Sequence, residues 1–156
     1  MVVKLKSVGQ VIRNKAQRWE RVVWLIPVLK SDLKQKYKLC IISGAIDVFV
    51  DVISRKLGIY DRYTSTKFIF DNNEILMDFN YKLSRGEEKV GFFHDFCTKN
   101  NLAPEECVAI GDGDSDMPIF GEVGFPVLFI AKETTEDLRK TVERQISKWS
   151  EIYKYL

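Results

Sequence analysis

The sequence predicts an α/β fold, a Rossmann-like parallel sheet with flanking helices. Short apolar runs begin at Leu39, Cys107 and Pro126, and each has the length of a strand buried on both faces. Segments with the periodicity of amphipathic helices separate these runs. Strands that alternate with helices in this way form a parallel sheet with helices on both faces.

Two helices are expected before the first strand. Apolar side chains recur at helical spacing over residues 11–26, between basic residues, which predicts an amphipathic helix. Pro27 suits the first turn of a second helix, where its missing N–H costs nothing, and this helix is expected to end near Lys36.

The first strand is expected at Leu39–Ile42 and stops at Ser43-Gly44. Residues 46–57 have helical periodicity and end at Gly58, a typical C-cap. A β-hairpin is predicted next, with strands at 67–70 and 75–77 around a four-residue turn.

The second half repeats the strand–helix pattern. Ser84 and Glu87 have the spacing of a capping box at the start of a helix, and Thr134 with Asp137 is a second candidate cap. Strands are expected at 107–110 and 126–130, with a short helix after Pro118 between them. The last predicted helix has four apolar residues on one side: Leu138, Val142, Ile146 and Trp149.

Composition indicates one soluble globular domain of 156 residues, with 46% apolar and 29% charged residues. The longest apolar stretch, residues 22–29, is too short to span a bilayer, and residues 1–10 lack the apolar core of a signal peptide. Cys40, Cys97 and Cys107 match neither a disulfide framework nor a zinc-site spacing, so we expect a cytoplasmic protein.

Charge is distributed unevenly along the chain. Residues 1–38 hold ten basic and two acidic side chains, a net charge of +8, and the other 118 residues carry −6. The first aspartate in the sequence is Asp32. The basic segment raises the alternative of nucleic-acid binding, but its charges surround a helix with an apolar face, so we expect at most non-specific, salt-sensitive binding.

The acidic segment Gly111–Asp116 is the strongest chemical signal. Its three carboxylates repel one another unless a cation lies between them, and Mg²⁺ typically takes one or two carboxylates with phosphate and water oxygens. The alternative is a solvated acidic turn whose side chains cap the next helix.

Ser43 and Lys89 are weaker signals. Ser43 follows a strand, so its hydroxyl and the next backbone N–H could hold a phosphate oxygen, or it could cap a helix. Lys89 could neutralise a phosphate, or it could be a solvated side chain compensated by Glu87 and Glu88. His94 is expected to be structural or solvated.

Three segments occur in order on matching elements: Cys40–Ala45, Gly86–Val90 and Val108–Asp116. These segments resemble motifs II, III and IV of the haloacid dehalogenase (HAD) superfamily. The resemblance is strongest to the phosphoserine-phosphatase-like branch of that superfamily. The resemblance covers about residues 27 to 156, and the closing segment 146–156 resembles the last helix of that branch.

The resemblance implies a role for each site residue in a Mg²⁺-dependent phosphomonoester phosphatase. Ser43 and the Gly44 backbone N–H would bind the phosphoryl group, and Lys89 would offset charge on the nucleophile and the phosphate. Asp112 would ligate Mg²⁺, while Asp116 would orient the loop and support the metal.

Two positions depart from the branch. Ser115 stands where the branch often carries an amide that touches the phosphate, and Thr64-Ser65 stands where an Asn after an aromatic residue is common. Ser115 is therefore a candidate phosphate-binding residue.

The large departure is motif I, a strand that ends in Asp-x-Asp and supplies the nucleophile and the general acid–base. No aspartate precedes Asp32, so the nucleophile is absent from this sequence. We expect a C-terminal fragment that is inactive by itself, in which residues 1–26 are a remnant of the helical cap and residues 27–156 form the HAD-like core without its first strand. The alternative is a complete, catalytically dead homologue that binds a phosphorylated ligand or a protein.

A response-regulator receiver domain is a rival, because Asp114–Pro118 fits the phosphorylation turn of such domains. It fails because receivers need a pair of acids after their first strand, and because 38 residues after Pro118 are too few for two more strand–helix units. The expected partners are a small phosphorylated metabolite and, for the chain itself, a second copy or a missing N-terminal part; neither a membrane nor a specific nucleic acid is expected.

Overall fold

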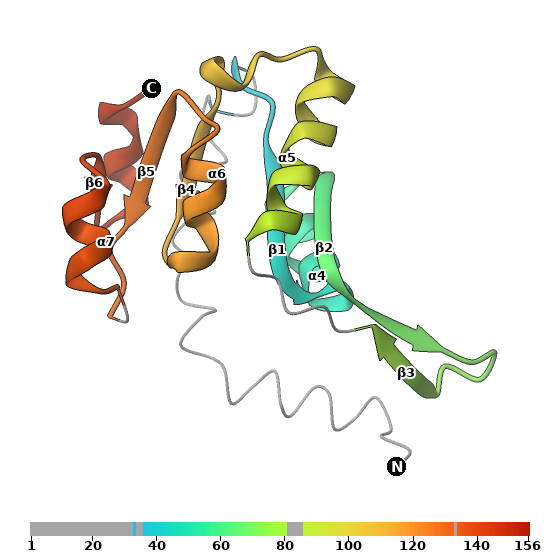
Figure 1. Ribbon diagram of the computed structural model, residues 1–156. Coiled ribbons are helices and arrows are strands. Elements are labelled where there is room, and N and C mark those ends of the chain that lie inside the picture. Colours follow the sequence, from blue (N-terminus) through green and yellow to red (C-terminus); the bar gives the residue numbers. More distant parts are fainter. Residues whose placement is uncertain (1–32, 34–35, 81–85, 133) are drawn as a thin grey trace. The chain divides into compact units, whose positions relative to one another are not determined.

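The computed structural model describes residues 33, 36–80, 86–132 and 134–156, which divide into two compact units, residues 1–83 and 84–156. The expected helices at 11–26 and 27–36, and the domain boundary at residue 26, lie outside the described residues or almost entirely so. Each unit holds a three-stranded sheet, so the fold is mixed α/β with parallel strand pairs and flanking helices (Figure 1).

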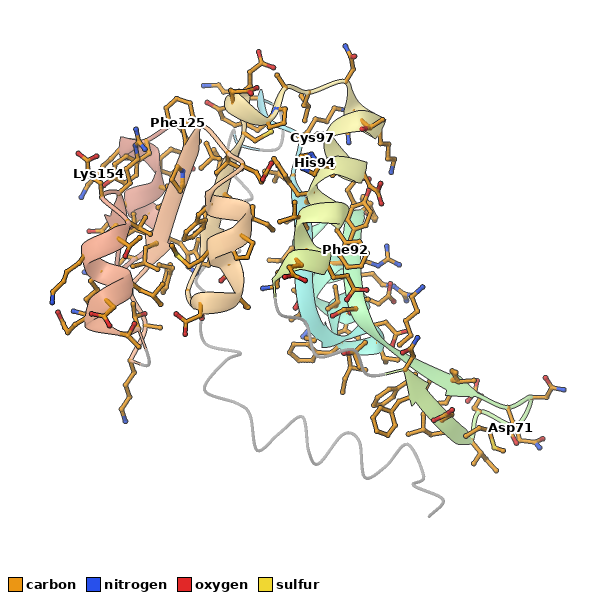
Figure 2. All side chains as sticks on the ribbon, viewed as in Figure 1. Asp71, Phe92, His94, Cys97, Phe125 and Lys154 are labelled. Carbon is orange, nitrogen blue, oxygen red and sulfur yellow. The ribbon has the colours of Figure 1, made fainter. Side chains whose placement is uncertain are left out.

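The N-terminal unit contains β1 (Cys40–Ile46), α4 (Asp47–Leu57), β2 (Asp61–Phe70) and β3 (Leu76–Asn80). β1 pairs with β2 in parallel, and β2 pairs with β3 antiparallel, which confirms the hairpin. Asp71 lies at the tip of the hairpin (Figure 2), where its Oδ1 accepts hydrogen bonds from the Asn73 and Ile75 backbone N–H groups at 2.9 and 2.8 Å. α4 packs against β1 and β2 and ends at Gly58, whose φ of 64° is the left-handed cap predicted.

The first strand differs from its prediction in two ways. It does not stop at Ser43-Gly44 but continues to Ile46, with an irregularity in its pairing with β2 between Ser43 and Ile46. It is also not buried on both faces, because all seven of its residues are only half-buried. The helix accordingly begins at Asp47.

The C-terminal unit contains α5 (Glu87–Asn100), β4 (Val108–Gly111), α6 (Met117–Phe120), β5 (Phe125–Phe129), α7 (Glu136–Thr141) and β6 (Gln145–Ile146). Three short 3₁₀ helices complete it: η2 (Pro104–Glu106), η3 (Asp114–Asp116) and η4 (Trp149–Lys154). The sheet order is β4-β5-β6, all parallel. Its core is an apolar cluster of Phe120, Leu128, Leu138 and Val142.

Both predicted helix caps in this unit are wrong. α5 begins at Glu87 after Gly86, so Ser84 lies too far upstream to be its N-cap. α7 is capped by Thr135, whose side chain accepts the Leu138 N–H at 3.3 Å. Thr134 instead accepts the Ala131 N–H at 2.8 Å.

The last predicted helix, with Leu138, Val142, Ile146 and Trp149 on one side, is shorter than expected. α7 ends at Thr141, Ile146 pairs with Phe129 as part of β6, and Trp149 begins η4. Within the described ranges, no helix is long and apolar enough to cross a membrane.

Candidate active site

The loop after β4 and the first turn of α5 form a polar cluster in the C-terminal unit. The Lys89 ammonium lies 2.7 Å from Asp116 Oδ1 and donates to Ser115 Oγ at 2.8 Å. The whole Lys89 residue is only 7% exposed. The interpretation of Lys89 as a solvated side chain is therefore wrong, because its charge is buried and paired with a carboxylate from the acidic loop.

Asp116 organises this loop with its second oxygen. Its Oδ2 accepts hydrogen bonds from the backbone N–H groups of Asp112 and Gly113, at 2.9 and 3.2 Å. The Asp116 N–H in turn donates to the Gly113 carbonyl at 3.0 Å. The Asp116 carboxylate thus fixes the turn and holds the lysine. It also accepts hydrogen bonds from backbone donors that the end of β4 leaves unpaired.

Two glycines make the approach of these segments geometrically feasible. A Cβ on Gly111 would lie 2.4 Å from Asp116 Cβ, so a larger residue there would displace the carboxylate. Gly86 has a φ of 88°, and a Cβ on it would lie 2.7 Å from Pro118 Cγ and 2.9 Å from the Ser115 carbonyl oxygen. The sequence pattern alone assigns neither glycine a role, although Gly86 directly precedes the Glu-Glu-Lys segment and Gly111 opens the acidic one.

Ser43 and Gly44 lie in the N-terminal unit. Ser43 Oγ accepts the Ala45 N–H at 3.1 Å, which is the local bond of a serine at a turn. Two threonines of the neighbouring strand β2 hold the same segment: Thr66 Oγ1 donates to the Gly44 carbonyl at 3.1 Å, and Thr64 Oγ1 donates to the Ala45 carbonyl. These hydroxyls were missed, because cross-strand register decides which side chains of β2 meet β1.

His94 has no place in this cluster. Its side chain is about half exposed, and Nε2 lies 3.3 Å from Glu122 Oε2. This fits the expectation of a structural or solvated histidine.

The acidic loop has ligands of the type that Mg²⁺ prefers, which are oxygen atoms including one or two carboxylates. Asp112 carries such a carboxylate just after β4. Both Asp116 oxygens are engaged by Lys89 and by the loop backbone. Among the residues that the structure describes, no group of three His, Cys, Asp or Glu side chains is gathered to hold a metal ion. The described residues therefore do not by themselves complete a magnesium site, and the metal roles of Asp112 and Asp116 stay predictions.

Sequence comparison finds several curated relatives named phosphoserine phosphatase. One from Polaromonas sp. is 31% identical over 135 residues, which is 83% of this chain and 55% of the relative. One from Archaeoglobus fulgidus is 26% identical over 111 residues, 71% of this chain and 32% of the relative. The matched part of the chain therefore spans from about a third to just over half of the length of these relatives.

Solved structures of phosphoserine phosphatase share the fold. An apo form superposes with a TM-score of 0.70 at 25% identity, covering 84% of this chain and 64% of the other. A phospho-aspartyl intermediate analogue gives a TM-score of 0.69 at 25% identity, covering 83% and 61%. The sequence also matches the haloacid dehalogenase-like hydrolase family over residues 5–120, most of its length. This chain belongs to the haloacid dehalogenase-like hydrolase family, in its phosphoserine-phosphatase-like branch.

Proposed function

We propose that this chain is the phosphate-handling portion of a Mg²⁺-dependent phosphomonoester phosphatase that acts on a small phosphorylated metabolite such as phosphoserine. The observation that carries the proposal is the buried Lys89 ammonium, which Asp116 and Ser115 hold beside the acidic loop. The names of the curated relatives support the substrate class.

Lys89 is suited to bind an anion. An ammonium group has three N–H donors, and the contacts found among the described residues use two of them, to Ser115 Oγ and Asp116 Oδ1. The third donor can reach an oxygen of a phosphoryl group. Because the side chain is buried, its charge is less screened by water than that of a surface lysine, which strengthens such a contact.

Ser43 is suited to the complementary task on its own unit. Its oxygen accepts the Ala45 N–H, so its hydroxyl hydrogen is available to donate to a phosphoryl oxygen. Thr66 and Thr64 hold the carbonyls of Gly44 and Ala45, and this supports a fixed direction for the backbone N–H groups of the same segment. The serine would therefore bind without first having to be ordered.

The covalent step needs a group that this sequence does not supply. A carboxylate nucleophile forms a phosphoryl-enzyme intermediate in aspartyl-phosphate chemistry, and no aspartate occurs before Asp32. Asp116 is unsuited to attack, because both of its oxygens are engaged. We therefore propose that the chain does not turn over by itself and corresponds to the C-terminal part of a longer phosphatase.

Turnover of the chain alone tests this proposal. The purified chain is incubated with Mg²⁺ and either O-phosphoserine or p-nitrophenyl phosphate, and released phosphate is measured. We expect no hydrolysis above that of the Asp112→Ala variant. Hydrolysis by the chain that disappears in this variant would overturn the proposal and require another nucleophile.

The competing proposal is a nucleophile-less homologue that binds a phosphorylated ligand or a protein partner. It predicts the same absence of turnover, so the coding frame upstream of Met1 separates the two. An in-frame apolar strand that ends in Asp-x-Asp favours the longer phosphatase, and a stop codon close upstream favours the binding module.

A further inference from the structure

Two of the three cysteines lie against each other in the C-terminal unit. The Sγ atoms of Cys97 and Cys107 are 3.8 Å apart. Cys97 lies in the C-terminal half of α5 (Figure 2), and Cys107 directly precedes β4. Both are thiols in this structure.

The backbone between the two cysteines holds them in this position. After α5 the chain turns at Asn101, in the left-handed region with a φ of 54°, and the Leu102 N–H donates back to the Cys97 carbonyl at 3.0 Å. η2 then completes the return, and the Cys107 N–H donates to the Pro104 carbonyl at 3.0 Å. A tight connection held by these backbone hydrogen bonds therefore sets the contact between the thiols.

The two thiols differ in their surroundings. Cys97 is buried at 4% exposure, whereas Cys107 is half-buried and is the member that a small molecule can reach. Burial above all, together with the contact with Cys97 and the charges of Glu106 and Glu105, raises the pKa of Cys107 to about 12. Cys107 is therefore a neutral thiol near pH 7, and its thiolate fraction grows as the pH rises.

We propose that Cys97 and Cys107 are an oxidisable dithiol, a modification site that small-molecule disulfides of the glutathione type convert into an intramolecular disulfide. One cysteine thiolate attacks a sulfur of oxidised glutathione, forms a mixed disulfide and releases the first glutathione thiolate. The second cysteine attacks the protein-side sulfur of that mixed disulfide and releases the second glutathione. The two protein thiols are oxidised, the glutathione disulfide is reduced, and the two protons go to the two glutathione thiolates.

The geometry requires only a local change. A disulfide bond is about 2.05 Å long, so the two sulfurs must approach each other by roughly 1.8 Å. The bond would join the C-terminal half of α5 to the start of β4. These elements carry Lys89 and precede Asp112, but the proposal does not depend on the function proposed for either residue.

Peptide mapping tests the proposal, because Lys99 lies between the two cysteines. The full chain is incubated with excess oxidised glutathione at about pH 8, alkylated and digested with trypsin. We expect peptides 90–99 and 100–132 to be recovered as one cross-linked species that has lost two hydrogens, while Cys40, on peptide 39–55, stays alkylated. Closure should accelerate with rising pH, and the midpoint of thermal unfolding should rise by roughly 5 °C.

Two variants make the test specific. Cys40→Ser should close the same cross-link at the same rate, and Cys97→Ser should accumulate a stable mixed disulfide of Cys107 with glutathione. The proposal is overturned if Cys97 and Cys107 are recovered as alkylated thiols or as separate glutathione adducts in the unsubstituted chain. It is equally overturned if either cysteine links to Cys40 or to a second copy in preference to the other.

Discussion

The Lys89–Asp116 pair supports a quantitative prediction about stability. The two side chains are only 9% and 18% exposed, and their charged atoms are 2.7 Å apart. Replacing Lys89 by Met leaves the carboxylate largely buried without its cation. Breaking a fully buried pair in this way costs about 3–5 kcal/mol, and the residual exposure of Asp116 lowers the expected loss in the free energy of unfolding to about 2–3 kcal/mol.

Asp116→Ala should cost more than Lys89→Met. It removes the same ion pair and also the acceptor of two backbone N–H groups, at about 1 kcal/mol each, so we expect a loss of about 4–5 kcal/mol. The double variant should lose less than the sum of the two single losses, by about 1–2 kcal/mol, because the second change removes no further ion pair.

Urea unfolding at equilibrium, followed by circular dichroism, measures these differences. Lys154→Met is the matched control: the Lys154 ammonium lies 3.5 Å from a Glu151 oxygen, but the two side chains are 66% and 30% exposed. This control should change the free energy of unfolding by less than about 0.5 kcal/mol. If Lys89→Met is no more destabilising than Lys154→Met, the buried pair does not stabilise the loop.

Three further predictions concern the loop and the titrating groups. Gly111→Ala should destabilise the chain by about 2–3 kcal/mol, because the added Cβ would meet the Asp116 side chain. Gly113→Ala is the control and should change stability little, because a Cβ there meets nothing within 4 Å. Equal effects of the two substitutions in urea unfolding would contradict this prediction. The pKa of Glu151 is lowered from 4.5 to about 2, chiefly by the backbone N–H groups of Ser147 and Lys148, so its stabilising contribution is present above about pH 4.5 and lost as the pH falls toward 2. Glu151→Gln should flatten the stability profile over that range, and an unchanged acid limb would refute the assignment. The pKa of Cys107 is raised from 9.0 to about 12, so the folded state holds this proton more tightly than the unfolded state does. The stability of the fold should therefore fall between about pH 9 and 12. Cys107→Ser should lack this loss, and an alkaline stability profile identical to that of the unsubstituted chain would count against the raised pKa.

Elements defined by local chemistry were predictable from the sequence. The turn at residues 71–74 carries its own hydrogen-bonding aspartate, and Gly58 supplies the left-handed residue that ends α4. The acidic segment is likewise visible as a loop, because glycines and carboxylates suit neither a strand nor a helix interior.

Errors arose where contacts distant in sequence override local pattern. Ser43 looks like the end of a strand, but Thr64 and Thr66 of β2 hold the backbone at Gly44 and Ala45, and β1 continues to Ile46. Ile146 fits a helical period with Leu138 and Val142, yet pairing with β5 makes it part of a strand. The register between strands is set by contacts across the whole sheet, so the sequence of one segment does not determine that register.

The candidate site shows the same division. The residue types were predictable, because lysine and aspartate in this order match a known motif pattern. The burial of Lys89 was not, because it depends on Asp116, which lies 27 residues away, and on close packing of Gly86 against Ser115 and Pro118. The local sequence places only Glu87 and Glu88 beside Lys89, and this local pattern is typical of a solvated side chain.

We propose that this chain holds the phosphate-handling residues of a phosphatase and needs a nucleophile from outside its sequence. The most direct test joins the N-terminal part of the Polaromonas phosphoserine phosphatase, up to the position aligned with Cys40, to residues 40–156, and measures phosphate release from O-phosphoserine with Mg²⁺. We expect this fusion to turn over, Lys89→Met and Asp112→Ala each to abolish its activity, and the present chain to show none. A folded fusion that hydrolyses nothing, or one that is indifferent to both substitutions, would contradict it.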